Sequence, residues 1–245
     1  MLRRGFLRTG LLAASASLLG GRNAFSQYDL VPVQVRPGDT LHGLALVHDT
    51  DVETIRELNQ ITGNLIRPGQ VIFVPRPAPP SEDDPALAPL IEVNKDLTIE
   101  KDHWKYIVVH HSATPTGNAE IFGQYHSNVR HMTNGLAYHF VIGNGSRSED
   151  GELEVGQRWI RQINGGHVQS DELNNIALGI CLVGNFESQQ PTDNQIKTAN
   201  ALINYLMNTA IPNPCEFTSH KEIQPHTTLC PGRFFPLDQM HERFG

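Results

Sequence analysis

Three residues that lie far apart in the chain have the chemistry of a zinc site. His110 ends the apolar run "WKYIVVHH", His220 follows the run "EFTS", and Cys230 comes ten residues after His220, directly before Pro-Gly. Imidazole and thiolate suit the borderline softness of zinc, and a catalytic zinc takes three protein ligands and leaves one position for water. Strand ends that meet at one edge of a sheet can bring these side chains together. Spacing alone also leaves an incidental arrangement open, because the chain has 12 histidines.

The segments that must position these residues alternate loosely between strands and helices. The runs "KYIVVHH", "AYHFVIG" and "IALGICLVG" have the length and the continuous apolar character of strands buried on both faces. In the first run, alternation places His110 on one face and His111 on the other. The clearest helix covers residues 191–207, where Thr192 and Gln195 form a capping box. We therefore expect an α/β domain with a mixed central sheet flanked by helices.

A smaller unit at residues 32–75 precedes this domain. A strand, two helical stretches and a final strand follow one another, with Pro-Gly turns after the first strand and before the last. The stretches "VRPGDTLHGLA", "IRELN" and "LIRPGQVIFVP" resemble a LysM domain, a small βααβ fold. The resemblance implies binding to glycans that contain N-acetylglucosamine, such as peptidoglycan or chitin. The groove would lie between two loops, formed by Gly38, Asp39, Thr40 and Leu41 and by Leu65, Ile66, Arg67 and Pro68.

Composition bounds the remaining organisation of the 245 residues. The net charge of −7 supplies no basic face, so we expect no nucleic-acid partner. Residues 76–102 begin with "RPAPPSEDDPALAP", a proline-rich acidic stretch that predicts a semi-rigid linker and a lead-in. The larger domain is then expected at residues 103–245.

The first 26 residues have the pattern of a removable leader. "RRGFLR" resembles a twin-arginine signal, which exports folded proteins, and "AFSQ" offers a cleavage site. An ordinary secretory signal with two chance arginines is the alternative. The apolar run "LLAASASLLG" is too short to span a bilayer stably, so we expect no transmembrane anchor in the mature chain. The expected location is the periplasm or cell envelope.

The larger domain resembles the zinc amidases related to bacteriophage lysozyme-amidases and peptidoglycan recognition proteins. The resemblance covers about residues 104–238 and is carried, in order, by "VVHHSAT", "AYHFVIG", "NNIALGICLVGNF" and "SHKEIQPHTTLCPG". It implies Zn2+ held by His110, His220 and Cys230. It also implies hydrolysis of the amide bond between N-acetylmuramic acid and the L-alanine of the stem peptide by zinc-activated water.

The same resemblance implies roles for further residues. Tyr138 matches a tyrosine that contacts the metal-bound water or the oxyanion, and Thr228 matches a position occupied by lysine or threonine. His167 and Asn175 match positions near the substrate. Cys181 stands where cytosolic anhydromuramyl amidases carry a glutamate base, so no such base is expected. The spacing from His220 to Cys230 is two residues longer than in close relatives, which leaves the register of Thr228 open.

Two other functions remain open at this stage. One is a non-catalytic protein that recognises peptidoglycan, and the other is a zinc peptidase that cuts within the stem. The presence of both Cys230 and Tyr138 favours the amidase, because relatives without the cysteine keep the groove and lose hydrolysis. Three cysteines cannot all pair within one chain. Zinc loading before export would protect Cys230 from oxidation, and Cys181 and Cys215 are candidates for a disulfide.

Overall fold

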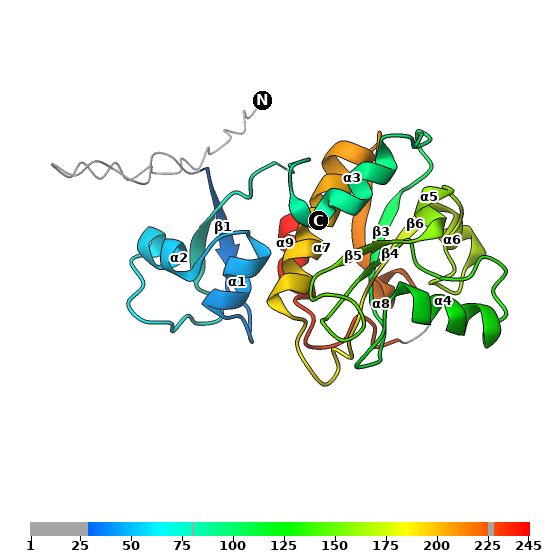
Figure 1. Cartoon of the computed structure of the whole chain (residues 1–245). Helices are drawn as coiled ribbons and strands as arrows, with labels where there is room; N and C mark the ends of the chain where they lie inside the picture. The colour runs from blue at the N-terminus through cyan, green and yellow to red at the C-terminus, as the bar shows by residue number, and fades with distance from the viewer. Residues whose placement is uncertain (1–28, 80, 225–227) are drawn as a thin grey trace, which may run out of the picture.

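The computed structural model describes residues 29–79, 81–224 and 228–245. The expected leader therefore lies outside the described residues. Figure 1 shows a smaller unit, from β1 to β2, beside a larger unit that contains the remaining elements. Among the described residues, no helix has both the length and the apolar character needed to cross a membrane.

The smaller unit has the expected β-α-α-β order. Its elements are β1 (Leu30–Gln34), α1 (Leu41–Val47), α2 (Val52–Asn59) and β2 (Val71–Pro75), and the two strands pair antiparallel. Both helices begin where a side chain can satisfy a free backbone N–H: Thr40 Oγ1 accepts from Gly43 N, and Asp51 Oδ1 accepts from Thr54 N. The unit has its own apolar core, which includes Val33, Leu41, Leu44, Ile55, Ile66 and Ile72.

The larger unit is built on a five-stranded sheet with the order β5-β4-β6-β3-β7. The strands are β3 (Tyr106–His111), β4 (Phe140–Ile142), β5 (Leu153–Val155), β6 (Ala177–Leu182) and β7 (Glu216–Ser219). Strands β4, β6, β3 and β7 run parallel, and β5 pairs antiparallel at the edge. The predicted mixed sheet is thus confirmed.

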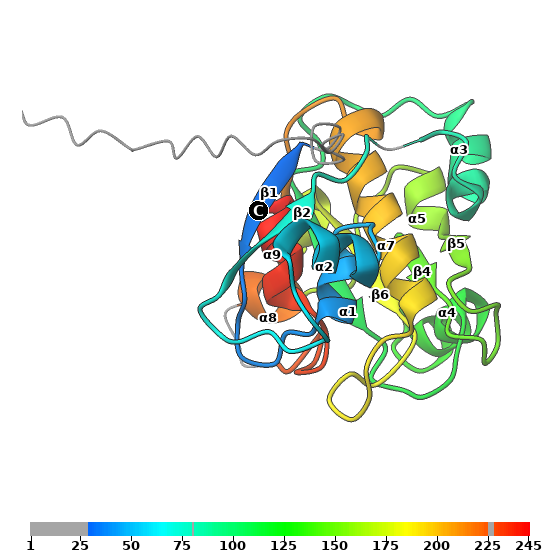
Figure 2. The same ribbon diagram turned by 90° about the vertical axis from the view of Figure 1, so that its left-hand side faces the viewer.

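Helices cover both faces of this sheet. The face that carries Ile107 and Val109 packs against α7 (Asp193–Tyr205), whose predicted capping box of Thr192 and Gln195 is present, and against α9 (Leu237–Phe244). A π-helical turn, Leu206–Ala210, follows α7. The other face packs against α4 (Ala119–Asn128), α6 (Asp171–Ile176) and α8 (His220–Ile223), and a short helix, α5 (Gln157–Ile160), follows β5. Figure 2 shows α7 and α9 behind the smaller unit.

Part of the expected linker packs into the larger unit. A short 3-10 helix (Pro85–Leu87) continues into α3 (Ala88–Asn94), and both Leu87 and Leu90 are fully buried in the main core. Leu87 belongs to the stretch expected as a semi-rigid linker, and its burial corrects that expectation for the residues around it, whereas Leu90 lies in the expected lead-in. The packed segment begins at Asp84, whose side chain caps the 3-10 helix.

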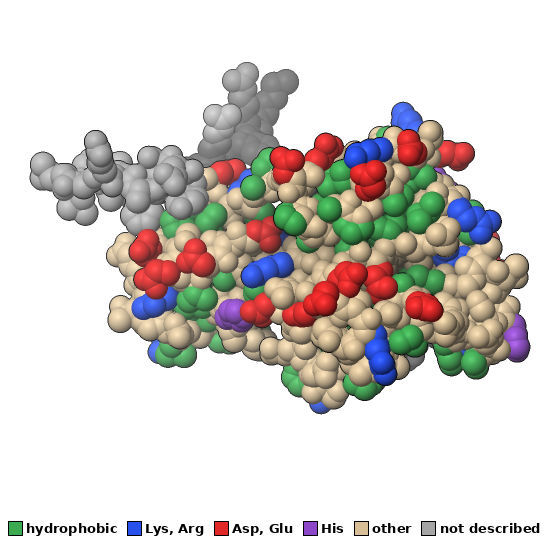
Figure 3. Space-filling model, viewed as in Figure 1, with side chains coloured by type: hydrophobic (Ala, Val, Ile, Leu, Met, Phe, Trp, Pro, Cys, Tyr) green, Lys and Arg blue, Asp and Glu red, His purple; other side chains and the backbone are tan. Residues whose placement is uncertain are grey.

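The visible surface is acidic on both units. Figure 3 shows acidic side chains on both units of this face, with the basic side chains scattered among them. This distribution agrees with the net charge of −7.

The junction between the units contains a buried histidine that makes the stability of the protein sensitive to acid. His48 follows α1 and is only 2% exposed. Burial, helped by the charge of Arg243 and opposed by that of Asp49, lowers the pKa of His48 from 6.5 to about 4. As the pH falls, His48 is therefore protonated near pH 6.5 in the unfolded chain but only near pH 4 in the folded chain.

We predict that His48 removes about 3 kcal/mol of stability as the pH falls from 7 to 4. Urea unfolding of the parent and of His48→Gln at both pH values measures this. The variant should lose about 3 kcal/mol less than the parent over this pH interval, whatever its stability at pH 7. An equal loss in both proteins would show that His48 is not the group responsible.

Candidate metal centre

Neighbouring strands deliver the two predicted histidine ligands to the same edge of the sheet. His110 lies in β3, the neighbour of the edge strand β7, and Val109 on β3 is paired with Ser219 at the end of β7. His220 follows Ser219 directly as the first residue of α8. Because β3 and β7 run parallel, their carboxyl ends meet, and the two imidazole rings lie 4.6 Å apart between centroids.

Cys230 completes the cluster from a loop. Its Sγ lies 3.7 Å from His110 Nδ1, and ligand atoms of His110, His220 and Cys230 all lie within 4.8 Å of one another. A histidine nitrogen and a cysteine sulfur bound to one tetrahedral zinc are about 3.5 Å apart. The donor set and its spacing therefore fit a zinc ion.

A chain of hydrogen bonds fixes which nitrogen of His110 is free to bind a metal. His167 Nε2 lies 3.1 Å from Ala177 O, and because a carbonyl can only accept, Nε2 carries the proton. His167 Nδ1 is then an acceptor, and His110 Nε2 donates to it over 3.0 Å. The lone pair of His110 is left on Nδ1, which faces Cys230. A partner of this kind commonly orients a metal-bound histidine.

His220 is prepared in the same way by Gln224. The Gln169 backbone N–H donates to Gln224 Oε1, which identifies that atom as the oxygen. His220 Nε2 lies 2.7 Å from the same oxygen and must therefore donate to it. The unprotonated nitrogen is again Nδ1. Sequence reasoning missed Gln224, whose only signal is its position four residues after His220.

Protonation of the cluster is set mainly by burial. Burial, with neighbouring His167 and His220, lowers the pKa of His110 well below 6.5, so its ring is neutral. Burial also raises the pKa of Cys230 to about 12, although the His111 N–H, 3.3 Å from the sulfur, works in the opposite direction. A metal must therefore displace a proton from Cys230 when it binds.

Tyr138 lies beside the cluster, with its ring centroid 5.3 Å from that of His110. Burial is the main cause that raises the pKa of Tyr138 well above 10, and Cys181 and Cys230 act in the same direction. The hydroxyl is therefore protonated and can donate. The structure places Tyr138 just before β4, which begins at Phe140, and not within the expected strand.

The remaining predicted residues occupy different surroundings. Thr228 is half-buried, and its Oγ1 accepts from Cys230 N at 3.3 Å, which places it at the cluster. His167 is only 7% exposed and contacts His110. Asn175 is exposed, and its carbonyl lies 3.0 Å from His103 Nε2.

Asn174, which the sequence did not single out, holds the loop of His167 in place. Its Oδ1 accepts from His167 N and Val168 N, and its Nδ2 donates to Val168 O. The side chain is 4% exposed. A buried amide with three backbone partners is typical of a residue that fixes a loop.

The other two cysteines are buried thiols. Cys181 lies opposite His110 in the register of β3 and β6 and packs with Val141 and Val183 near Tyr138. Cys215 belongs to the main core on the other side of the sheet. Both are unpaired, so the disulfide that the sequence left open is not formed in this structure.

In the smaller unit, the two loops of the expected glycan groove lie side by side. Val35 N donates to Gln70 O, and Gly69 N donates to Val35 O, so that the β1–β2 ladder continues to the base of both loops. Leu41 and Ile66 are buried in the core of the unit. The outward-facing members of the two loops are Gly38, Thr40, Leu65, Arg67 and Pro68, and Asp39 is half-buried.

A parallel sheet whose strand ends gather two histidines and a cysteine, next to a βααβ unit, defines a class of α/β proteins with a site that could hold a metal ion. Residues 100–233, more than half of the chain, match the N-acetylmuramoyl-L-alanine amidase family. The chain belongs to that family. Residues 33–75 match the LysM domain, which confirms the expected fold of the smaller unit.

Known relatives are similar over parts of their length. Peptidoglycan recognition protein 3 of Mus musculus is 40% identical over 68 residues, which cover 28% of this chain and 17% of that protein. Peptidoglycan-recognition protein SA of Drosophila melanogaster is 32% identical over 107 residues, which cover 40% of this chain and 48% of that protein. The chain thus spans less than half the length of these relatives. The solved amidase LysC of Clostridium intestinale is 25% identical, covers 60% of this chain and 93% of its own, and superposes with a TM-score of 0.48.

Proposed function

We propose that this protein is a zinc-dependent N-acetylmuramoyl-L-alanine amidase of the cell envelope, which hydrolyses the bond between N-acetylmuramic acid and L-alanine in peptidoglycan. The observation that carries the proposal is the cluster of His110, His220 and Cys230, in which hydrogen bonds leave Nδ1 of both histidines free. Family membership supports the same reaction. The site holds the donor set that its zinc-dependent relatives need.

Each residue of the centre has a role that follows from its contacts. His110, His220 and Cys230 would hold the zinc, which when bound lowers the pKa of a water from about 15.7 to about 7 and polarises a carbonyl. The protonated Tyr138 hydroxyl would donate to the oxygen of the scissile amide as negative charge develops on it. Thr228 Oγ1 accepts from Cys230 N, so its own proton is available for the same oxygen.

Further parts of the proposal concern contacts with the substrate and the export of the protein. Substrate contacts by His167 and Asn175 stay predictions, and the contact that the structure shows for His167 is with His110. Helix α4, next to Tyr138, exposes Ile121 and Tyr125, and the exposed Val129 follows it directly. The LysM loops Gly38–Leu41 and 65–68 would bind the glycan. The domain limits, the twin-arginine leader and export to the periplasm or cell envelope are part of this proposal.

A digestion experiment tests the reaction. Purified protein is incubated with peptidoglycan, with and without a zinc chelator, and the soluble products are identified by mass spectrometry. We expect stem peptides with a free L-alanine amino terminus, and we expect their release to stop with chelator and to return with added zinc. Fragments cut within the stem would indicate a peptidase instead, and binding without any release would indicate a recognition protein.

Tyr138→Phe tests the donor to the developing charge. Loss of one such donor typically lowers kcat by about 10²- to 10³-fold. We expect that loss with an almost unchanged KM, because the phenyl ring keeps its packing. Zinc content, measured by atomic absorption, should equal that of the parent. A variant that loses zinc together with activity would place Tyr138 among the groups that hold the metal.

A further inference from the structure

Helix α1 of the LysM domain is packed into the amidase domain. Val47, the last residue of α1, is fully buried and belongs to the same apolar cluster as Leu202 and Ile203 of α7 and Met240 of α9. Leu46 packs against the edge of this cluster. The LysM domain thus contributes a side chain to the core of its neighbour, which a freely tethered module would not do.

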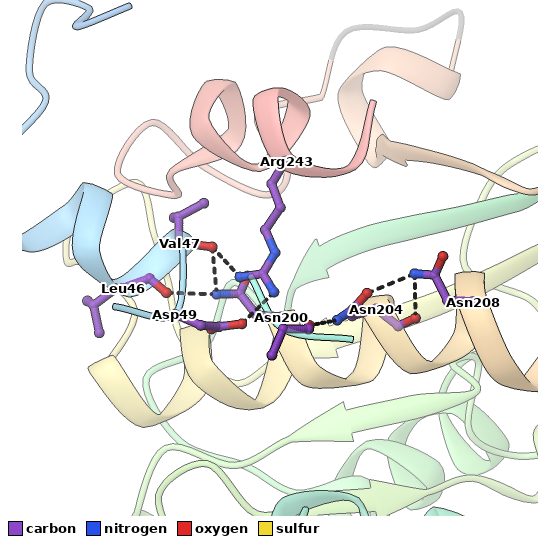
Figure 4. Close-up of polar contacts among 8 residues, drawn as sticks. Leu46, Val47, Asp49, Asn200, Asn204, Asn208 and Arg243 are labelled. Carbon is purple, nitrogen blue, oxygen red and sulfur yellow. Dashed lines mark hydrogen bonds and ion pairs between the residues drawn. The ribbon is translucent and has the colours of Figure 1, made fainter. Parts of the chain in front are cut away.

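Two amidase side chains satisfy the carbonyl end of α1. Asn200 Nδ2, on α7, donates to Leu46 O at 2.9 Å and lies 3.3 Å from Val47 O. The Arg243 guanidinium, on α9, donates to Val47 O and to the Asp49 carboxylate. Figure 4 shows both side chains converging on this turn from their two helices. The last carbonyls of a helix need such partners, and a cation there is favourable.

The residues of this contact are buried. Asn200 is fully buried, and the side chain of Arg243 is only 4% exposed. A charged side chain is rarely this buried unless it is paired, and Arg243 finds its partners across the junction. The contact is therefore part of the fold of both domains.

A second group of contacts holds the other end of α1. Gln239 Nε2 donates to Asp39 Oδ1 at 2.7 Å. The Arg36 guanidinium lies 3.3 Å from the carboxylate of Asp238 and 3.0 Å from that of Glu242. These three amidase residues are all on α9. Helix α1 is thus contacted by amidase side chains near both of its ends.

We propose that α7 and α9 form a docking surface that fixes the LysM domain in one position relative to the metal centre. On the proposed function, a glycan gripped by the LysM loops is then presented to the centre at a set distance, not within the reach of a flexible tether. Docking leaves Gly38, Thr40, Leu65, Arg67 and Pro68 outward-facing, so the groove stays open. Asp39 belongs to one groove loop and also binds Gln239, which ties the groove itself to α9.

Distances between spin labels test the docking without reference to activity. Labels are attached to the full chain at Glu57→Cys on α2 and Lys95→Cys after α3, both exposed positions, whereas the three native cysteines are buried. We expect one narrow distance distribution. Adding Arg36→Ala and Asp49→Ala, which change only the LysM side, together with Asn200→Ala, should broaden it. The matched control Lys197→Ala, an exposed position one turn from Asn200 on α7, should leave it narrow.

A broad distribution in the parent, or an unchanged narrow one in the triple variant, would overturn the proposal. Circular dichroism of each variant checks that the domains remain folded. Arg36→Ala with Asp49→Ala alone gives a second test if the triple variant does not fold.

The activity arm separates this inference from the proposed reaction. Rates are measured on insoluble peptidoglycan and on a soluble disaccharide-peptide that is too small to reach both domains. We expect the docking variant to keep its rate on the soluble substrate and to lose about tenfold or more on the insoluble one. A parent that cuts neither substrate would end the proposed function, whereas equal rates of parent and variant on both would end only the docking inference.

Discussion

Cys230→Ser is expected to abolish hydrolysis and stoichiometric zinc binding in a protein that remains folded. Serine has nearly the shape of cysteine, but its hydroxyl does not ionise as a thiolate and is a poor zinc ligand. The variant should lose at least about 10³-fold in kcat/KM, because the group that activates the water is lost. Stem-peptide release and zinc content per chain, measured on the same preparation, check this.

Cys215→Ser is the matched control for this change. Cys215 is also buried and unpaired, but it lies in the main core on the other side of the sheet. The same chemical change there should cost stability and leave zinc content and kcat near those of the parent. If Cys230→Ser kept a full complement of zinc and hydrolysed peptidoglycan at the parental rate, the assignment of Cys230 as a ligand would be wrong.

The sequence was informative where one short pattern determines one local structure. Alternation in "KYIVVHH" placed His110 and His111 on opposite faces of β3, and the structure has Ile107 and Val109 in the main core with His110 on the other face. The capping box of Thr192 and Gln195 marked the start of α7 correctly. Both patterns depend on residues close together in the sequence, so they can be read without knowledge of the tertiary fold.

The sequence was uninformative where a residue acts through a distant partner. Gln224 and Asn174 orient the centre through backbone groups of segments that approach only in the folded chain. Arg243 and Asn200 are 43 residues apart and meet at a turn of a different domain. A polar residue that bonds to other segments looks the same in sequence as one on the surface, so Asn174, Asn200 and Arg243 carried no signal, and Gln224 carried only its position four residues after His220.

The chemistry of the centre therefore depends on two kinds of information: where its ligands lie, and which hydrogen bonds those ligands make. The two histidine ligands come from strand ends and Cys230 comes from a loop, and periodicity and family motifs reveal these positions. The tautomer of each histidine ligand is set by side-chain hydrogen bonds in the folded chain, which neither periodicity nor family motifs reveal. The chain from Ala177 O through His167 to His110 crosses from β6 to β3 and decides which nitrogen of His110 is free.

His167→Ala is expected to weaken zinc binding by about 10- to 100-fold, the usual cost of losing a partner that orients a metal ligand. Without His167, the His110 ring has no acceptor at Nε2, and both its tautomer and its orientation are released. Competition with a chelator of known affinity measures the zinc Kd. Activity should fall at low zinc and recover largely in excess zinc, since His110, His220 and Cys230 are all still present.

If His167 positions His110, substitutions of His167 should change zinc affinity and not only the stability of the fold. His167→Gln keeps a side-chain oxygen that can accept from His110 Nε2, so it should recover a substantial part of the zinc affinity lost in His167→Ala. His139 is the matched control: it too is buried and its ring lies 5.8 Å from that of His167, but its nitrogens bond to Gly179 N and Ile163 O of the backbone and not to His110. His139→Ala should lower stability and leave the zinc Kd of the folded protein within a few-fold of the parent. Equal zinc affinity in His167→Ala and the parent would mean that the hydrogen bond between the two rings does not prepare the ligand.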